Sequence, residues 1–204
     1  MNSKPLFITG IGTDIGKTLI SAILVEKLKC DYWKPIQSGD LENSDTMKVQ
    51  ALISNNESVF HPEAYRLTQP YSPHKSAVLD GITIDEKTIV APKTANSLLI
   101  EGAGGLMVPL NNHCLIIDLI KQLDAEVILV SQNYLGSINH TLLSIEALTQ
   151  RGIIIKGILF NGDENTSTED YIISYTGISH LGRVPKLSYI NKNTIIEAGK
   201  YIYL

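Results

Sequence analysis

Short apolar runs alternate with stretches of helical periodicity along the chain, and this alternation limits the fold more than any other feature. The runs have the length of strands but lack the strict apolar–polar alternation of a strand with one solvated face. Such strands are typical of a mostly parallel sheet covered by helices on both sides. The expected strands cover residues 6–9, 32–34, 97–101, 127–131 and 153–160, with a weaker one before Val184; the expected helices cover residues 17–29, 45–54, 115–123, 137–150 and 168–175. We therefore predict a doubly wound α/β fold.

The length favours one domain over residues 1–204. The chain has 204 residues, 44% of them hydrophobic, and domains commonly contain about 100 to 200 residues. The least regular stretch, residues 55–81, contains Pro62, Pro70 and Pro73. We interpret it as a long surface excursion and not as a linker between domains.

Charge and composition argue against several classes of partner. Lysine and arginine number 17 against 21 aspartates and glutamates, without a long basic run, so we expect no nucleic acid partner. The apolar run that ends at Ile8 is too short for a signal-peptide core or a membrane span, so we expect a cytoplasmic protein without a membrane partner. Cys30 and Cys114 follow no metal or redox spacing and are expected to be reduced thiols.

A glycine-rich loop joins the first expected strand to the first expected helix. It reads GIGTDIGKT over residues 10–18. Glycines at such a turn let backbone N–H groups approach an anion at a helix N-terminus, which predicts a P-loop NTPase-like fold that binds nucleotide. Lys17 would reach the outer phosphates and Thr18 would bind magnesium, with Asp14, Ile15 and Gly16 completing the loop. The strict pattern GxxxxGK[ST] is missed at Ile11, and a plain strand-to-helix turn is the alternative.

A second glycine-rich element follows another apolar run. Residues 97–100 end in Glu101, which precedes Gly102, Ala103, Gly104 and Gly105. A carboxylate at the end of a strand, beside glycines that permit close backbone approach, suits a magnesium-nucleotide site. Glu101 is therefore the first candidate for a metal ligand, although a strand-end carboxylate can also cap a turn.

Four further motifs make the pattern specific: KPIQSG at 34–39, NSD at 43–45, LGSINH at 135–140 and GRVP at 182–185. With the loop and with EGAGG, in this order and spacing, the chain resembles the dethiobiotin synthetase family over residues 6–185. The resemblance implies conversion of 7,8-diaminopelargonic acid, CO₂ and ATP to dethiobiotin, ADP and phosphate, with Mg²⁺. It also implies a carbamate and a carbamic-phosphoric anhydride as intermediates.

The resemblance also implies roles for single residues. Lys17 and Lys34 supply positive charge, and Thr13 and Ser38 hydrogen-bond the phosphate or the diamine end. The implied metal ligands are Thr18, Asp45 and Glu101; the implied nucleotide contacts include Gly102, Ala103, Gly104, Asn161, Gly162, Pro185, Lys186 and Leu187. Alternatively, Lys34 is an ordinary solvated surface lysine, because lysine is seldom buried unless it is paired.

In the resembling family the substrate site is shared by two chains, which implies a homodimer. The start of the helix expected at residues 137–150 would bind the carboxylate of the diamine through Gly136, Ser137, Ile138 and Asn139, with Tyr171 as a further donor. A helix N-terminus suits an anion. Alternatively, Ser137 only caps its helix.

The chain departs from the family pattern at the loop. Ile11 and Gly12 stand where members often carry Thr and Asp, and Asp14 stands where Glu is common. These differences change side chains and leave the backbone cradle in place. The guanine-recognition run Asn-Lys-x-Asp is missing after the strand at 153–160, where the chain reads NGDE. We therefore expect adenine, which Asn161 could meet with its paired donor and acceptor.

Two other classes of protein share this fold. A small-molecule kinase would close an arginine-bearing lid over the phosphates, and the chain has only three arginines, Arg66, Arg151 and Arg183. A nucleotide-switch ATPase commonly has an extra lysine early in the loop, and residues 10–13 contain none. Both remain alternatives at this point.

Overall fold

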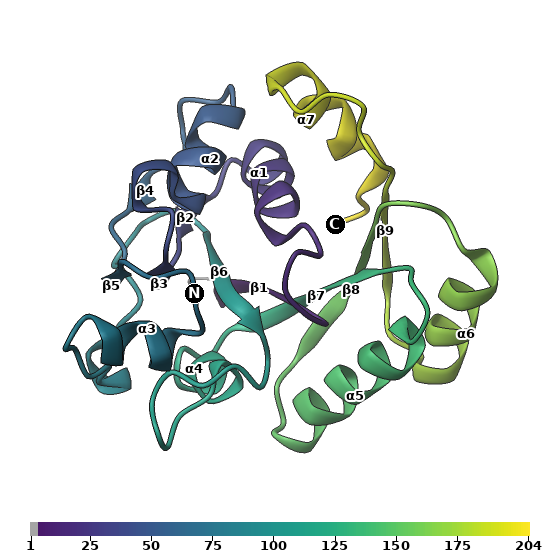
Figure 1. Ribbon diagram of the computed structural model, residues 1–204. Coiled ribbons are helices and arrows are strands. Elements are labelled where there is room, and N and C mark those ends of the chain that lie inside the picture. Colours follow the sequence, from purple (N-terminus) through teal and green to yellow (C-terminus); the bar gives the residue numbers. More distant parts are fainter. Residues whose placement is uncertain (1–3) are drawn as a thin grey trace.

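A seven-stranded sheet forms the centre of the molecule in a computed structural model that describes residues 4–204 (Figure 1). The strand order is β4-β2-β6-β1-β7-β8-β9, and every neighbouring pair is parallel. The strands are β1 (Leu6–Gly10), β2 (Asp31–Trp33), β4 (Phe60–His61), β6 (Leu98–Gly105), β7 (Glu126–Gln132), β8 (Ile155–Asn161) and β9 (His180–Val184). The prediction of a mostly parallel sheet is confirmed.

Helices cover both faces of this sheet (Figure 1). They are α1 (Lys17–Leu28), α2 (Asp45–Leu52), α3 (Pro73–Leu79), α4 (Ile116–Gln122), α5 (Ser137–Gln150), α6 (Thr166–Thr176) and α7 (Lys192–Ala198), with short 3-10 helices at Leu41–Asn43, Glu86–Thr88 and Gly199–Tyr201. Because successive side chains of a strand point to opposite faces, Phe7 joins the core under α4, α5 and α6, whereas Ile8 joins the core under α1, α2 and α7. This arrangement is the doubly wound fold.

The irregular stretch at residues 55–81 contains short elements that the pattern did not predict. β4 extends the edge of the main sheet, and β5 (Tyr65–Leu67) pairs in parallel with β3 (Ile36–Ser38) in a separate two-stranded sheet. α3 then packs beside these two strands. The surface excursion predicted here therefore contains short folded elements that pair with and pack on the rest of the molecule.

The order of the strands places the expected ligand-binding position at the carboxyl end of β1. After β1 the chain continues to β2 on one side, and after β6 it continues to β7 on the other. Ligands in doubly wound sheets bind outside the carboxyl ends of the strands where this direction reverses. The glycine-rich loop after β1 lies at that place.

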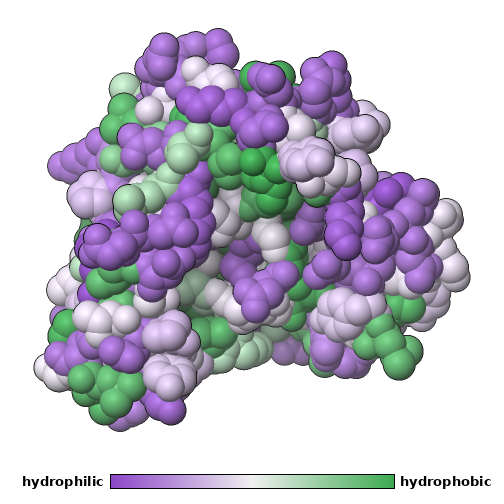
Figure 2. Space-filling view, turned by 45° about the horizontal axis from the view of Figure 1, so that its top comes forward, coloured by the Kyte–Doolittle hydropathy of each residue, from purple (hydrophilic) through white to green (hydrophobic). Residues whose placement is uncertain are grey.

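The outer surface is mixed in character. Hydrophilic side chains cover much of the face seen in Figure 2, and hydrophobic patches lie between them. Within residues 4–204, no helix combines the length and the apolar composition that a membrane crossing requires.

Candidate nucleotide and substrate site

The glycine-rich loop connects β1 to α1, and its left-handed backbone at residue 16 requires glycine. Asp14 (φ 58°) and Gly16 (φ 89°) adopt left-handed conformations, and α1 begins at Lys17. A Cβ atom on Gly16 would lie 2.1 Å from Nδ2 of Asn161. That amide, at the end of β8, donates a hydrogen bond of 2.9 Å to the carbonyl of Ile15. The loop is thus an anion cradle at a helix N-terminus, held in shape by Asn161.

Two of the three predicted metal ligands, Asp45 and Glu101, contact the ammonium group of Lys34, and the third, Thr18, contacts Glu101. Its Nζ lies 2.6 Å from Oδ2 of Asp45 and 3.2 Å from Oε1 of Glu101, and the Thr18 hydroxyl donates to the same Glu101 oxygen over 2.9 Å. Lys34 is only 4% exposed. The interpretation of Lys34 as a solvated surface lysine is therefore wrong, because two carboxylates compensate its charge inside the protein.

The electrostatics distinguish the two lysines. Burial lowers the pKa of Lys34, but the attraction of Glu101 and Asp45 outweighs it, so the pKa lies above its ordinary value of 10.5. Burial raises the pKa of Asp45, but Lys34 and Lys48 together more than reverse that effect, so the pKa lies below its ordinary value. For Lys17, burial is the larger influence and its pKa falls below 10.5; its Nζ donates to the carbonyl of Gly12 over 3.1 Å. Lys34 is a fixed cation, whereas Lys17 has no carboxylate within ion-pair distance in the described part of the chain.

A cavity of about 860 Å³ opens above these groups. Eleven predicted site residues line it: Thr13, Asp14, Gly16, Lys17, Thr18, Lys34, Ser38, Asp45, Glu101, Ala103 and Gly104. Ser38 Oγ is buried and has no hydrogen-bond partner within residues 4–204. A buried hydroxyl without a partner is costly, so the Ser38 group suits a ligand that would satisfy it.

Glu101 lies in the middle of β6 and not at its end. The strand runs through the following glycines to Gly105, which pairs with Gly10 of β1. A Cβ on Gly105 would lie 3.3 Å from the carbonyl oxygen of Gly10, and one on Gly104 would lie 2.8 Å from Val108. These glycines therefore let β6 pass close to the nucleotide loop. Glu101 does not cap a turn, since it is buried and bonded to Thr18 and Lys34.

Several functional neighbours were missed by the sequence pattern. The Tyr32 hydroxyl donates to Oε2 of Glu101 over 2.9 Å, and Oε1 of Gln37 accepts from the backbone N–H of Asp45 over 3.2 Å. Lys48 Nζ lies 3.5 Å from Oδ1 of Asp45. Lys48 follows Asp45 by one helical turn, so the i,i+3 spacing could have indicated it. The Tyr32 contact depends on the pairing of β2 with β6, which no local motif reveals.

The residues predicted to contact the base lie at the next strands of the sheet. Asn161 pairs with Val184, and the N–H of Gly162 donates to the Val184 carbonyl over 2.8 Å. Pro185, Lys186 and Leu187 follow directly. This group does not line the 860 Å³ cavity, but the bond from Asn161 to the loop joins it to the phosphate cradle. The Asn161 amide is therefore already engaged with the loop.

The residues predicted to bind the diamine carboxylate lie apart from this cavity. Gly136 (φ 101°) is the N-cap of α5, and no side chain caps the helix. Ser137 is the first helical residue and is buried, so the alternative that Ser137 caps α5 is wrong. Asn139 is exposed, and Tyr171 is 48% exposed and stacks on Tyr175 at 5.7 Å. Within one chain, residues 136–139 and Tyr171 therefore lie outside the cavity that contains the phosphate cradle.

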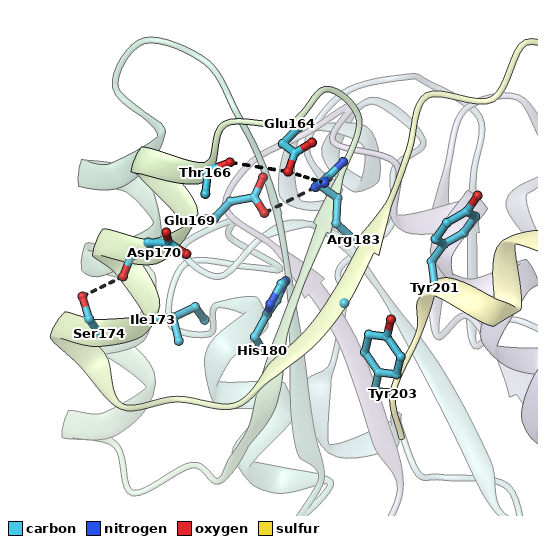
Figure 3. Close-up of a pocket in the computed structure, with 11 residues that line it drawn as sticks. Glu164, Thr166, Glu169, Asp170, Ile173, Ser174, His180, Arg183, Tyr201 and Tyr203 are labelled. Atoms are coloured by element: carbon cyan, nitrogen blue, oxygen red, sulfur yellow. Dashed lines mark hydrogen bonds and ion pairs between the residues drawn. The ribbon is translucent and has the colours of Figure 1, made fainter.

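A second cavity of about 560 Å³ lies between α6, β9 and the C-terminal tyrosines (Figure 3). Arg183 points to two carboxylates there, with ion pairs of 2.9 Å to Glu164 and 3.4 Å to Glu169. None of the predicted site residues lines this cavity. Because its guanidinium is already neutralised, Arg183 is poorly suited to a phosphoryl-transfer lid.

The donor set fits magnesium better than a transition metal. Within residues 4–204 there is no group of three or more His, Cys, Asp or Glu side chains able to hold a metal ion. Two carboxylates and a hydroxyl, from Asp45, Glu101 and Thr18, are the oxygen ligands that Mg²⁺ uses when phosphates and waters complete its octahedron.

Solved structures of low sequence identity share this fold. The cell division ATPase MinD of Pyrococcus furiosus matches with a TM-score of 0.61 at 11% identity, covering 98% of each chain. A ParA family ATPase of Chlorobium tepidum TLS matches with a TM-score of 0.58 at 14% identity, covering 98% of this chain and 100% of that one. These likenesses confirm the predicted P-loop NTPase-like fold and concern the fold alone.

Sequence relatives are more specific. A family described as an AAA domain matches residues 4–194. A protein of Christiangramia forsetii named ATP-dependent dethiobiotin synthetase BioD is 55% identical over 95% of this chain and 93% of its own length. Proteins of the same name from Cytophaga hutchinsonii and Rhodopseudomonas palustris are 50% and 44% identical, covering 94% and 96% of this chain and 93% and 92% of their own. The chain therefore belongs to the ATP-dependent dethiobiotin synthetase family.

Proposed function

We propose that this protein closes the ring of dethiobiotin from 7,8-diaminopelargonic acid and CO₂, with conversion of ATP to ADP and phosphate. The observation that carries the proposal is the single cavity that joins a phosphate cradle to the buried Lys34, Asp45 and Glu101 cluster. Relatives named for this reaction, identical at half or more of the aligned positions, support it.

The proposed chemistry has three steps. One amine of the diamine attacks CO₂ and loses a proton, giving a carbamate. A carbamate oxygen then attacks the γ-phosphorus of ATP, and the bond to ADP breaks, which leaves a carbamic-phosphoric anhydride. The second amine attacks the carbamate carbon, phosphate departs, and loss of a proton leaves the cyclic urea.

Lys17 and Lys34 would reduce the electrostatic repulsion between the two anionic reactants of this route. A carbamate anion must approach an anionic triphosphate, and preorganised cations stabilise the charge that develops between them. Lys34 is held in place by Asp45 and Glu101 before any ligand arrives. Lys17, bonded only to a loop carbonyl, is suited to follow the outer phosphates. Ser38 and Thr13, which line the same cavity, would orient the carbamate or the phosphate by hydrogen bonds.

Thr18, Asp45 and Glu101 would hold Mg²⁺, which neutralises phosphate charge when it is bound. Asp45 suits this role because Lys34 and Lys48 lower its pKa and favour the ionised carboxylate. Asn161, Gly162 and residues 185–187 would surround the adenine. Since the Asn161 amide donates to the loop, we infer that its remaining N–H and its carbonyl oxygen serve the base.

Phosphate release under omission of single components tests the proposal. Protein, ATP, magnesium, bicarbonate and the diamine are mixed, and each component is left out in turn. Phosphate release that requires both bicarbonate and diamine is the expected result. Hydrolysis of ATP without the diamine would instead indicate a nucleotide switch, and a stable phosphorylated product would indicate a kinase. The Lys17→Ala variant controls for contaminating ATPases.

We also propose that the working unit is a homodimer. The diamine ends in a carboxylate several methylenes from its amines, and distant binding energy helps to orient a reacting end. The start of α5 and Tyr171 lie away from the phosphate cavity of their own chain. A second chain that supplies residues 136–139 would complete the substrate site.

A further inference from the structure

A buried tyrosine is bonded to the central carboxylate of the proposed site. The hydroxyl of Tyr32 donates to Oε2 of Glu101 over 2.9 Å. The other carboxylate oxygen, Oε1, accepts from Thr18 over 2.9 Å and from Lys34 over 3.2 Å. Tyr32 is 0% exposed and Glu101 is 1% exposed. The two oxygens of Glu101 therefore have separate tasks: one faces the site and the other is bonded to the tyrosine.

The sheet fixes the position of the tyrosine. Tyr32 is in β2 and pairs with Leu99 of the adjacent β6, two residues before Glu101. Residues two apart on a strand share a face, and a long aromatic side chain reaches such a diagonal neighbour. The ring packs on Phe60 of the edge strand β4 at 5.6 Å and belongs to the core under α1 and α7. Its hydroxyl has little freedom to move away from Glu101.

Burial makes this hydrogen bond a strong constraint. An apolar ring of the same shape would fill the core equally well, whereas a phenol brings a hydroxyl that must find a partner or lose its hydration without compensation. Its partner is the one carboxylate that also bonds Thr18 and Lys34. Without the tyrosine hydroxyl, Oε2 of Glu101 would be a buried charged oxygen that lacks this hydrogen bond. The carboxylate could then rotate to seek another donor.

We propose that Tyr32 is a positioning residue that orients the Glu101 carboxylate for magnesium-nucleotide binding. This inference rests on the proposed function, because it assigns Glu101 to the magnesium side of the site. Tyr32 is fully buried and does not line the 860 Å³ cavity. It acts through Glu101 by holding Oε2, so that Oε1 stays directed at Thr18 and the cavity. Groups that orient metal ligands change metal affinity by roughly 10- to 100-fold when they are removed.

The test measures ADP binding by calorimetry with and without magnesium in the Tyr32→Phe variant. We expect the affinity for metal-free ADP to stay within about twofold of the native value. The gain in affinity that magnesium provides should fall at least about 10-fold. Tyr65→Phe is the matched control, because its hydroxyl also bonds neighbours, the Asp85 backbone N–H and Thr88, but outside the 860 Å³ cavity.

A double variant separates positioning from general stabilisation. In the Glu101→Gln background, Tyr32→Phe should cause no further loss of the magnesium effect, since the carboxylate through which the tyrosine acts is already gone. Additive losses would overturn action through Glu101. Equal losses with and without magnesium, or a Tyr32→Phe protein that matches Tyr65→Phe, would overturn the proposal as well. If native protein shows no magnesium-dependent ADP binding, the proposed function itself fails.

Discussion

The two site lysines differ in what holds them, and this difference separates their effects on activity and stability. Lys17 donates to the Gly12 carbonyl, whereas Lys34 is ion-paired inside the protein with Asp45 and Glu101. Removal of Lys17 leaves no carboxylate without its partner. Removal of Lys34 takes a buried cation from two carboxylates, although Asp45 keeps Lys48 at 3.5 Å and Glu101 keeps the hydroxyls of Thr18 and Tyr32.

We predict that Lys17→Ala reduces turnover about 100- to 1,000-fold, the effect of losing one preorganised contact to developing charge. The melting temperature should stay near the native value, because the lost hydrogen bond is a single bond within a loop. Steady-state phosphate release and thermal unfolding measure the two quantities. Near-native turnover at saturating ATP and diamine would remove Lys17 from the mechanism.

Lys34→Ala should reduce both activity and stability. Breaking a buried ion pair by removal of one partner costs about 3 to 5 kcal/mol, and urea unfolding of the ligand-free protein measures that change. Lys29→Ala is the control, because it breaks an exposed pair of 2.6 Å with Glu57 and exposed pairs contribute little. Equal stability of the two variants would contradict the buried-pair account. A Lys34→Ala protein with native turnover would contradict its catalytic role.

At the scale of elements, the connection from β1 to α1 depends on one glycine. Gly16→Ala would place a methyl group 2.1 Å from the Asn161 amide at a φ of 89°, which an L side chain adopts only with strain. We predict at least about a 10-fold loss of ADP affinity, equal to about 1.4 kcal/mol, by calorimetry. Gly12→Ala in the same loop meets no atom within 4 Å and should bind more tightly than Gly16→Ala. Weaker ADP binding by Gly12→Ala than by Gly16→Ala would contradict the proposed role of the Asn161 amide in holding the loop.

Elements that bury long apolar segments were predictable, whereas most of the short ones, β2 excepted, were not. β1, β7 and α5 match their expected ranges within a residue or two, because burial on both faces or a long amphipathic pattern marks them locally. β3 and β5 have three residues each, too few for a pattern. They form only because their backbone groups bond to one another. β6 continues through glycines that usually end strands, since β1 accepts that close approach.

The candidate site shows the same division. Motifs identified eleven of the residues that line the phosphate cavity. Most of them lie in the loop after β1, just after β2 or at the start of a helix, whereas Glu101, Ala103 and Gly104 lie within β6. Tyr32 carries no such signal, because it reaches Glu101 from the adjacent strand β2. The order of strand pairing decides this contact, and that order is a property of the whole sheet. Gln37 lies within the KPIQSG motif, but its bond to the start of α2 depends on how the chain turns between residues 37 and 45.

At the scale of the whole molecule, the proposed substrate site is incomplete in one chain. The phosphate cavity contains the lysines and carboxylates, but the start of α5 is not part of it. Leu135, just before that start, is fully exposed, and Tyr175 beside Tyr171 is 70% exposed. Burial of the exposed Leu135 side chain against another protein surface would be favourable. A second copy of this chain would cover them and bring the α5 start to the diamine.

Comparison of the diamine acid with its methyl ester tests this shared site. If the α5 start of the second chain binds the carboxylate, loss of its charge should raise KM strongly, by roughly 10-fold for a charge-assisted contact worth about 1.5 kcal/mol. Asn139→Ala should raise KM for the acid. In this variant KM should differ much less between acid and ester than in the native protein, because the contact with the carboxylate is already impaired. kcat for the acid should change less than KM. Sedimentation at the assay concentration should show a dimer. An active monomer, or native protein that treats acid and ester alike, would refute the shared site and leave the nucleotide assignment standing.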